Sequence, residues 1–236
     1  MTAPTLTIMC WSGGKDSALA LDALQRDPGY EVVGLLTTLS REFDRISHHG
    51  VRAELLDLQA ERIGLPLTKI HLDTTMADCT TMDQYEDLMA RAMREFHDQG
   101  VRAVGFGDIN LQDLREYREK RLDEVGMVGV FPLWLRDTAE LARDFIDRGF
   151  ATRLSCVDAK KLDASFAGRL YDDDLLNDLP AGVDPCGENG EFHSFCFDGP
   201  IYRGRPIPVR VGEILGRDTR TFADLLLAEE ELACGS

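Results

Sequence analysis

Short apolar runs alternate with longer amphipathic stretches through the first half of the chain. The apolar runs predict β-strands at residues 5–11, 30–39, 66–73, 101–109 and 127–134. The amphipathic stretches between them predict helices at residues 16–27, 48–64, 81–100 and 111–126. Such alternation is typical of βαβ units, so we expect an α/β fold with a parallel sheet.

The helix predicted at 81–100 carries apolar residues at steps of three and four. These residues are Tyr85, Leu88, Met89, Ala92, Met93 and Phe96. The spacing places them on one helical face. We expect that face to pack in the core.

After Trp134 the alternation weakens. A helix is predicted at 137–150, a strand at 151–159, a charged helix or turn at 171–180 and a strand at 206–215. Residues 181–200 are rich in glycine, proline and acidic side chains, and no helix or strand is predicted there. We therefore predict an α/β domain with a parallel sheet over residues 1–134 and a smaller α+β domain over 135–236.

The net charge and the length of the apolar runs limit the classes of partner that we expect for this protein. A formal net charge of −16 over 236 residues would repel a polyanion, so we expect no nucleic-acid partner. No positively charged start precedes a long apolar run, and no run approaches the length of a membrane span. We expect a cytoplasmic protein without a membrane partner.

The stretch SGGKDS lies between the first predicted strand and the first predicted helix. Gly13 and Gly14 permit unusual backbone angles and let a ligand approach the N–H groups. A helix N-terminus at that point favours a phosphate. The hydroxyls of Ser12 and Ser17 and the mobile charge of Lys15 suit the same ligand. We therefore predict a phosphate-binding loop at residues 12–17.

Asp16 is the unusual member of this loop. A carboxylate beside a phosphate is repulsive unless a divalent cation bridges them, so Asp16 is interpreted as an Mg²⁺ ligand or as an orienting group. The stretch is not a Walker A loop, because Met9 stands where the first glycine would be and Asp16 follows Lys15.

Several stretches together resemble known families. SGGKDS resembles the SGGxDS signature of the PP-loop ATP pyrophosphatases, which hold the pyrophosphate of ATP and release AMP and pyrophosphate. GFGDI (105–109), REYREKRL (115–122), FPLW (131–134) and GVDPCGENGEFHSF (182–195) resemble the diphthine–ammonia ligase family, including its bacterial members. That family ends its last signature in E-x-G-E-(F/Y)-H-T. Ser194 replaces the threonine here and keeps the hydroxyl.

The resemblance implies an ATP-dependent, AMP-forming carboxylate–ammonia ligase with ATP and Mg²⁺ as cofactors. A substrate carboxylate would attack the α-phosphorus of ATP, and free ammonium would supply the nitrogen that attacks the acyl adenylate. The family's substrate is diphthine, a modified histidine of elongation factor 2. Two other functions stay open: an adenylating or amidohydrolase enzyme of corrinoid (cobalamin) salvage, and an ATP or AMP sensor without turnover. Related small α/β enzymes often form homodimers, and the oligomeric state stays open.

Ligands of open parallel sheets bind beyond the carboxyl ends of the strands. We therefore expect the loops at 12–17, 37–49 and 107–118 to meet over the nucleotide. Thr37 and Thr38 are interpreted either as adenine contacts or as plain strand formers. Asp108, after Gly107, is either a site group or a helix cap.

Two arginines and two histidines add candidates around these loops. Arg115 and Arg118 are candidates for a phosphate or a carboxylate, or for a solvated face. The resemblance implies that His48 and His49 face the substrate.

The segment 188–194 is predicted to lie opposite ATP. Glu188, Glu191 and His193 would act there, the two carboxylates by holding ammonium or by taking its proton. Asn189, Gly190 and Ser194 would complete the substrate contacts, whereas the alternative is a polar surface turn. Cys186, His193 and Cys196 form a nominal zinc set, but their spacing matches no established zinc finger.

Overall fold

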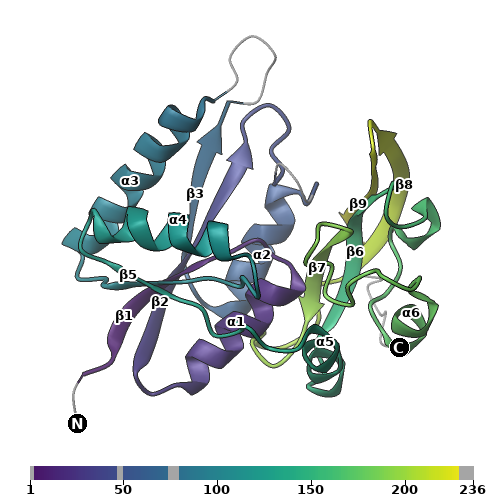
Figure 1. Cartoon of the computed structure of the whole chain (residues 1–236), viewed down its shortest axis with the longest axis horizontal. Helices are drawn as coiled ribbons and strands as arrows, with labels where there is room; N and C mark the ends of the chain where they lie inside the picture. Colours follow the sequence, from purple (N-terminus) through teal and green to yellow (C-terminus); the bar gives the residue numbers. More distant parts are fainter. Residues whose placement is uncertain (1–2, 47–49, 74–79, 229–236) are drawn as a thin grey trace, which may run out of the picture.

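The computed structural model describes residues 3–46, 50–73 and 80–228. It contains two β-sheets, which lie side by side in Figure 1, the N-terminal sheet on the left and the C-terminal sheet on the right. Among the described residues, no helix has both the length and the apolar character needed to cross a membrane.

The N-terminal sheet has five strands in the order β3-β2-β1-β4-β5. Their bounds are β1 Thr5–Cys10, β2 Tyr30–Ser40, β3 Leu67–Leu72, β4 Ala103–Gly105 and β5 Val128–Val130. Every neighbouring pair is parallel, and the chain crosses from each strand to the next through a helix. The predicted α/β class with a parallel sheet is confirmed.

Four helices cover the two faces of this sheet: α1 Lys15–Arg26, α2 Ala53–Ile63, α3 Met82–Asp98 and α4 Gln112–Asp123. Neighbouring strand residues point to opposite faces. Met9 therefore packs with α1 and α2, whereas Ile8 packs with α3 and α4. Local signals set the ends of these helices. Thr81 and Gln84 form a capping box at the start of α3, and Gly64 ends α2 in the left-handed conformation.

The C-terminal sheet has four antiparallel strands in the order β7-β6-β9-β8. Their bounds are β6 Ala151–Asp158, β7 Phe192–Asp198, β8 Val209–Arg217 and β9 Arg220–Leu227. The helices α5 Thr138–Asp147 and α6 Asp173–Asp178 and a 3-10 turn, η1 Ala164–Phe166, accompany it. The α+β character is confirmed. Strands β7 and β9, however, lie where the sequence pattern predicts none.

Strand β7 joins the two halves of the molecule. The N–H of Cys196 donates to the carbonyl of Gly13 at 2.8 Å, and the N–H of Lys15 donates to Oγ of Ser194 at 3.1 Å. A Cβ on Gly14 would lie 3.0 Å from the carbonyl oxygen of Ser194, so this close approach favours glycine. One hydrophobic core continues from α1 and α2 to the inner face of the C-terminal sheet. The loop at 12–17 is thereby held against β7.

Candidate active site

A cavity of about 750 Å³ opens between the two sheets, beyond the carboxyl ends of β1, β2 and β4. Most of the predicted site residues line it. They are Ser12, Gly14, Lys15, Asp16, Ser17, Thr37, Thr38, Gly107, Asp108, Arg118, Glu188, Asn189, Gly190, His193 and Ser194. Gly13 and Glu191 are not among the lining residues. His48 and His49 lie outside the described residues.

Gly13 shapes the loop from behind the cavity. Its φ is +72°, and a Cβ there would lie 2.7 Å from Oε1 of Gln59. The amide of Gln59, which is fully buried, donates to the Gly13 carbonyl at 2.9 Å and accepts from the indole of Trp11 at 2.8 Å. This packing leaves no room for a side chain. Gly13 therefore fixes the path of the loop.

Helix α1 begins at the cavity wall. Its N-cap, Gly14, has no side-chain cap bond. The hydroxyl of Ser17 donates to the Gly14 carbonyl at 2.9 Å, and Ser12 Oγ lies 3.1 Å from Ser17 Oγ. The residues of the first turn of α1 thus line the cavity, and the dipole at a helix N-terminus favours an anion.

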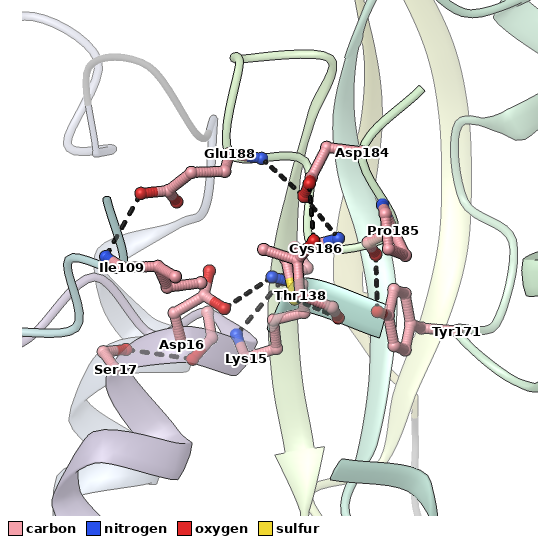
Figure 2. A network of polar contacts seen from close by, with 12 residues as sticks. Lys15, Asp16, Ser17, Ile109, Thr138, Tyr171, Asp184, Pro185, Cys186 and Glu188 are labelled. Atoms are coloured by element: carbon pink, nitrogen blue, oxygen red, sulfur yellow. Dashed lines mark hydrogen bonds and ion pairs between the residues drawn. The ribbon is translucent and has the colours of Figure 1, made fainter. Parts of the chain in front are cut away.

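Lys15 and Asp16 form an ion pair within this loop, drawn in Figure 2. The ammonium Nζ lies 2.5 Å from Oδ1 of Asp16, and the lysine side chain is 3% exposed against 33% for the aspartate. Burial lowers the pKa of Lys15, but Asp16 and other neighbouring groups together outweigh it, and the pKa is raised. Lys15 is therefore a charged group in the wall, and Asp16 presents its carboxylate to the cavity.

Asp108 and Arg118 form a second ion pair in the N-terminal wall. Arg118 Nε lies 2.8 Å from Oδ2 of Asp108, and its guanidinium stacks on the ring of Phe106 at 4.3 Å. Burial raises the pKa of Asp108, as does the nearby Asp16, against the lowering effect of Arg118. The N-cap of α4 is Leu111, so Asp108 is not the helix cap.

Arg115 points elsewhere. Its guanidinium lies 4.8 Å from the ring of Phe131 and 4.6 Å from that of Trp134, and its Nε lies 2.8 Å from Glu119. Arg115 does not appear in the cavity wall. Of the two predicted arginines, the structure brings Arg118 alone to the cavity.

Glu188 crosses from the C-terminal half to the N-terminal half, as Figure 2 shows. Its carboxylate accepts from the N–H groups of Ile109 and Asn110, each at 3.1 Å. Burial raises its pKa, and these two hydrogen bonds oppose the rise. A carboxyl group with a raised pKa beside a cavity is a candidate for proton exchange with a ligand.

The loop around Glu188 is held by two further carboxylates. Asp184 accepts from the N–H of Cys186 at 2.8 Å and from the hydroxyl of Thr138 at 2.7 Å. Glu191, only 3% exposed, accepts from the N–H of Asp184 and from the side chain of Asn189, both at 3.1 Å. The structure thus places Glu191 behind the loop.

The described residues contain no group of three or more His, Cys, Asp and Glu side chains placed to hold a metal ion. Cys186 donates to the Thr138 carbonyl at 3.3 Å, and Cys196 donates to that of Asp198 at 3.4 Å. An Mg²⁺ ion could instead be held by carboxylates of the cavity wall together with phosphate oxygens of a ligand. Asp16 and Asp108 both line the cavity, and such an ion takes one or two carboxylates together with phosphate oxygens.

Some lining residues were not predicted. Tyr85 and Met89 of α3 line the cavity. Met89 also packs against the core cluster that contains Met93 and Phe96, and Ala92 is buried, so the interpretation of this face as core is confirmed at these positions. Their helical spacing cannot separate a core face from a cavity wall. Arg220, at the start of β9, also lines the cavity, and no local motif marks it.

Comparisons with known proteins identify relatives of this chain. The family model of the diphthamide synthase N-terminal domain matches residues 5–129, and that of the diphthamide synthase C-terminal domain matches residues 137–227. Diphthine–ammonia ligase of Danio rerio is 31% identical over 221 residues, which cover 83% of each chain. The human diphthine–ammonia ligase is 26% identical over 234 residues, covering 90% of this chain and 85% of that one.

A solved structure also matches. The U34-tRNA thiolase NcsA from Methanococcus maripaludis superposes with a TM-score of 0.37 and 15% identity, over 61% of this chain and 56% of that one. A likeness at this level carries no conclusion about function. The two family models together span most of the chain, and the predicted resemblance is confirmed: the chain belongs to the diphthamide synthase family.

Proposed function

We propose that this chain is an ATP-dependent ligase that adenylates a substrate carboxylate and then transfers ammonia to it, with AMP and pyrophosphate as the other products. The observation that carries the proposal is the placement of two loops on one cavity. Residues of the loop at 12–17 and of the segment 187–194 both line this cavity. A sensor that only held ATP would need no second loop of this kind.

The nucleotide side is proposed to consist of the loop 12–17 and the carboxyl ends of β2 and β4. The N–H groups of Asp16 and Ser17 and the Lys15 ammonium would bind the pyrophosphate portion of ATP, with Gly107 close behind them. Thr37 and Thr38 would contact the adenosine. An Mg²⁺ ion held by Asp16 and the phosphates would neutralise the charge that develops on pyrophosphate as it leaves.

The acceptor side is proposed to consist of Glu188, Asn189, Gly190, His193 and Ser194. Glu188 is the proposed general base: it takes a proton from ammonium, so that neutral ammonia can attack the acyl adenylate. Its raised pKa suits that task. Glu191 positions the loop. We propose free ammonium as the nitrogen donor and the cytoplasm as the compartment; the homodimer stays a prediction.

The proposed acceptor is the carboxylate of diphthine on a protein, since the matched relatives from Danio rerio and Homo sapiens are named diphthine–ammonia ligases. Such a substrate places its carboxylate at the end of a side chain that enters the cavity. Corrinoid acids are the comparison substrates of the test.

The test is exchange between labelled pyrophosphate and ATP in the presence of Mg²⁺, with diphthine-bearing elongation factor 2 or corrinoid acids as acceptor. We expect exchange that depends on the diphthine-bearing protein. Asp16→Asn should abolish it, because the proposed metal ligand loses its charge. Asp87→Asn, an exposed carboxylate on α3, is the matched control. Exchange that only a corrinoid acid supports would overturn the diphthine assignment, and ATP binding without any exchange would favour a sensor.

A further inference from the structure

Arg220 reaches the cavity from the C-terminal sheet. Arg220 is the first residue of β9, and in the sheet register its backbone lies opposite Asp158 of β6. Cys156 of β6 lies between His193 of β7 and Phe222 of β9 in the sheet register. Since residues two apart on a strand share a face, Arg220 lies on the same face as Phe222 and hence as His193. Both Arg220 and His193 line the cavity.

The guanidinium of Arg220 lacks the carboxylate partner that the other two cations of the wall have. Lys15 is paired with Asp16, and Arg118 with Asp108. In the described part of the chain, Nη1 of Arg220 is a buried nitrogen without a hydrogen-bond partner, and no carboxylate lies within ion-pair distance of this residue. Its side chain contacts the thiol of Cys156, which is a weak acceptor.

A buried guanidinium nitrogen without an acceptor is costly, and a carboxylate can accept from two guanidinium nitrogens at once. Buried guanidinium nitrogens without a hydrogen-bond partner also occur on Arg62, Arg118, Arg121 and Arg153. Arg62, Arg121 and Arg153 do not line the cavity, whereas Arg118 lines it but has its ion pair with Asp108. Arg220 therefore differs from them because it lines the cavity and has no carboxylate partner among the described residues.

The position of Arg220 separates it from the phosphate loop. Ser194 of β7 contacts Lys15, and β9 lies two strands from β7 in the sheet. Strands are spaced by about 4.8 Å, so β9 lies roughly 10 Å across the sheet from β7. A phosphate held by the loop 12–17 is served by cations and N–H groups of its own. Arg220 is placed for a second anion.

We infer that Arg220 binds the carboxylate of the acceptor substrate and directs it toward the α-phosphorus of ATP. The inference rests on the proposed function. One carboxylate oxygen stays on the guanidinium, while the other forms a bond to the α-phosphorus. The bond from that phosphorus to the pyrophosphate oxygen breaks, and pyrophosphate leaves with the electron pair. Arg220 stays protonated throughout and gives up no proton.

The first experiment measures KM in acceptor-dependent pyrophosphate–ATP exchange for Arg220→Gln and Arg220→Lys. We expect Arg220→Gln to raise the KM for the diphthine-bearing protein roughly 10- to 100-fold, the range for a hydrogen-bonded charge pair, with the KM for ATP unchanged. Arg220→Lys should recover part of the loss. Arg217→Gln, in the same hairpin but outside the cavity wall, is the control and should match the unmodified enzyme. A higher KM for ATP alone would assign Arg220 to the nucleotide phosphates and overturn the inference.

The second experiment measures binding without turnover. The unmodified enzyme with ATP should bind the acceptor protein in its carboxylate form more tightly than in its amide form, because only the carboxylate pairs with the guanidinium. Arg220→Gln should lose this preference. Preference without exchange would contradict the proposed adenylation, whereas the binding of the acceptor carboxylate by Arg220 would be supported. An unmodified enzyme that binds both forms equally would contradict the inference itself.

Discussion

The two walls of the cavity are built on different principles. In the N-terminal wall, backbone segments touch: a Cβ on Gly107 would lie 2.9 Å from the carbonyl carbon of Asp16. In the C-terminal wall, carboxylates hold the segment 184–191 through hydrogen bonds to its N–H groups. Backbone contacts tolerate no added atoms, whereas a polar framework tolerates small changes in charge. We therefore expect steric substitutions in the N-terminal wall to reduce turnover more than electrostatic substitutions in the C-terminal wall.

The largest expected effect is that of Gly107→Val in the N-terminal wall. Added atoms would press on the backbone of Asp16 and Ser17 and displace the first turn of α1, so we expect no measurable turnover. Gly107→Ala should retain a trace of activity. Gly216→Ala is the control, since a Cβ there meets nothing within 4 Å. Steady-state rates measure the effect of each variant, and circular dichroism checks that each variant is folded. Normal turnover of Gly107→Val would show that this contact is not needed.

The pair Glu188→Gln and Glu191→Gln compares the front and the back of the second wall. Glu188 faces the cavity, so loss of the proposed base should lower kcat about 100-fold. Glu191 acts through the segment 184–190, so its loss should lower kcat by less.

The pH profile sharpens this contrast. Because burial raises the pKa of Glu188, the unmodified rate should rise with pH through that raised value as the carboxylate ionises. The profile of Glu188→Gln should lose this limb, and that of Glu191→Gln should keep it. An equal loss of kcat and of the limb in both variants would remove the distinction between them.

Asp224→Asn tests a polar contact that ties the two halves together. Asp224 of β9 accepts from Arg52 at 2.7 Å and from Arg45 at 2.9 Å, both in the segment between β2 and α2. The hydrogen bonds from Arg52, followed by those from Arg45, lower its pKa against the effect of burial. We expect a loss of about 1–2 kcal/mol in the free energy of unfolding near neutral pH.

The sign of the pH dependence follows from this lowered pKa. Stabilisation by Asp224 is present above the usual value of 3.8 and is lost as the pH falls through the lowered value. The difference in stability between the unmodified protein and Asp224→Asn should therefore shrink in acid. Chemical denaturation at several pH values measures it, with Asp87→Asn as the control. A difference that grows in acid would contradict the ion pair.

The same contrast explains which parts the sequence could predict. The first wall comes from residues near the ends of successive parallel strands, so SGGKDS and GFGDI could be located from local patterns. The second wall depends on pairing between β6, β7 and β9, residues distant in sequence. Strand β7 lies in a stretch rich in glycine and acidic residues, and Arg220 gains its place only through β9. No local sequence pattern predicts strand β7 or the position of Arg220 at the cavity.

The smallest expected effect lies at the junction of the two regions. Leu135 has a φ of +56°, a conformation that side chains with a Cβ disfavour, and its side chain is 73% exposed. Asparagine tolerates this conformation better, so Leu135→Asn should raise the free energy of unfolding by about 0.5 kcal/mol. Leu135→Ala removes the same apolar surface but keeps the strain, and should give no such gain. Because the N–H of Leu135 donates to the Ile109 carbonyl at 2.7 Å, the backbone there is fixed by a hydrogen bond that both variants keep. Equal stability of the two variants in thermal denaturation would show that strain at residue 135 costs nothing measurable.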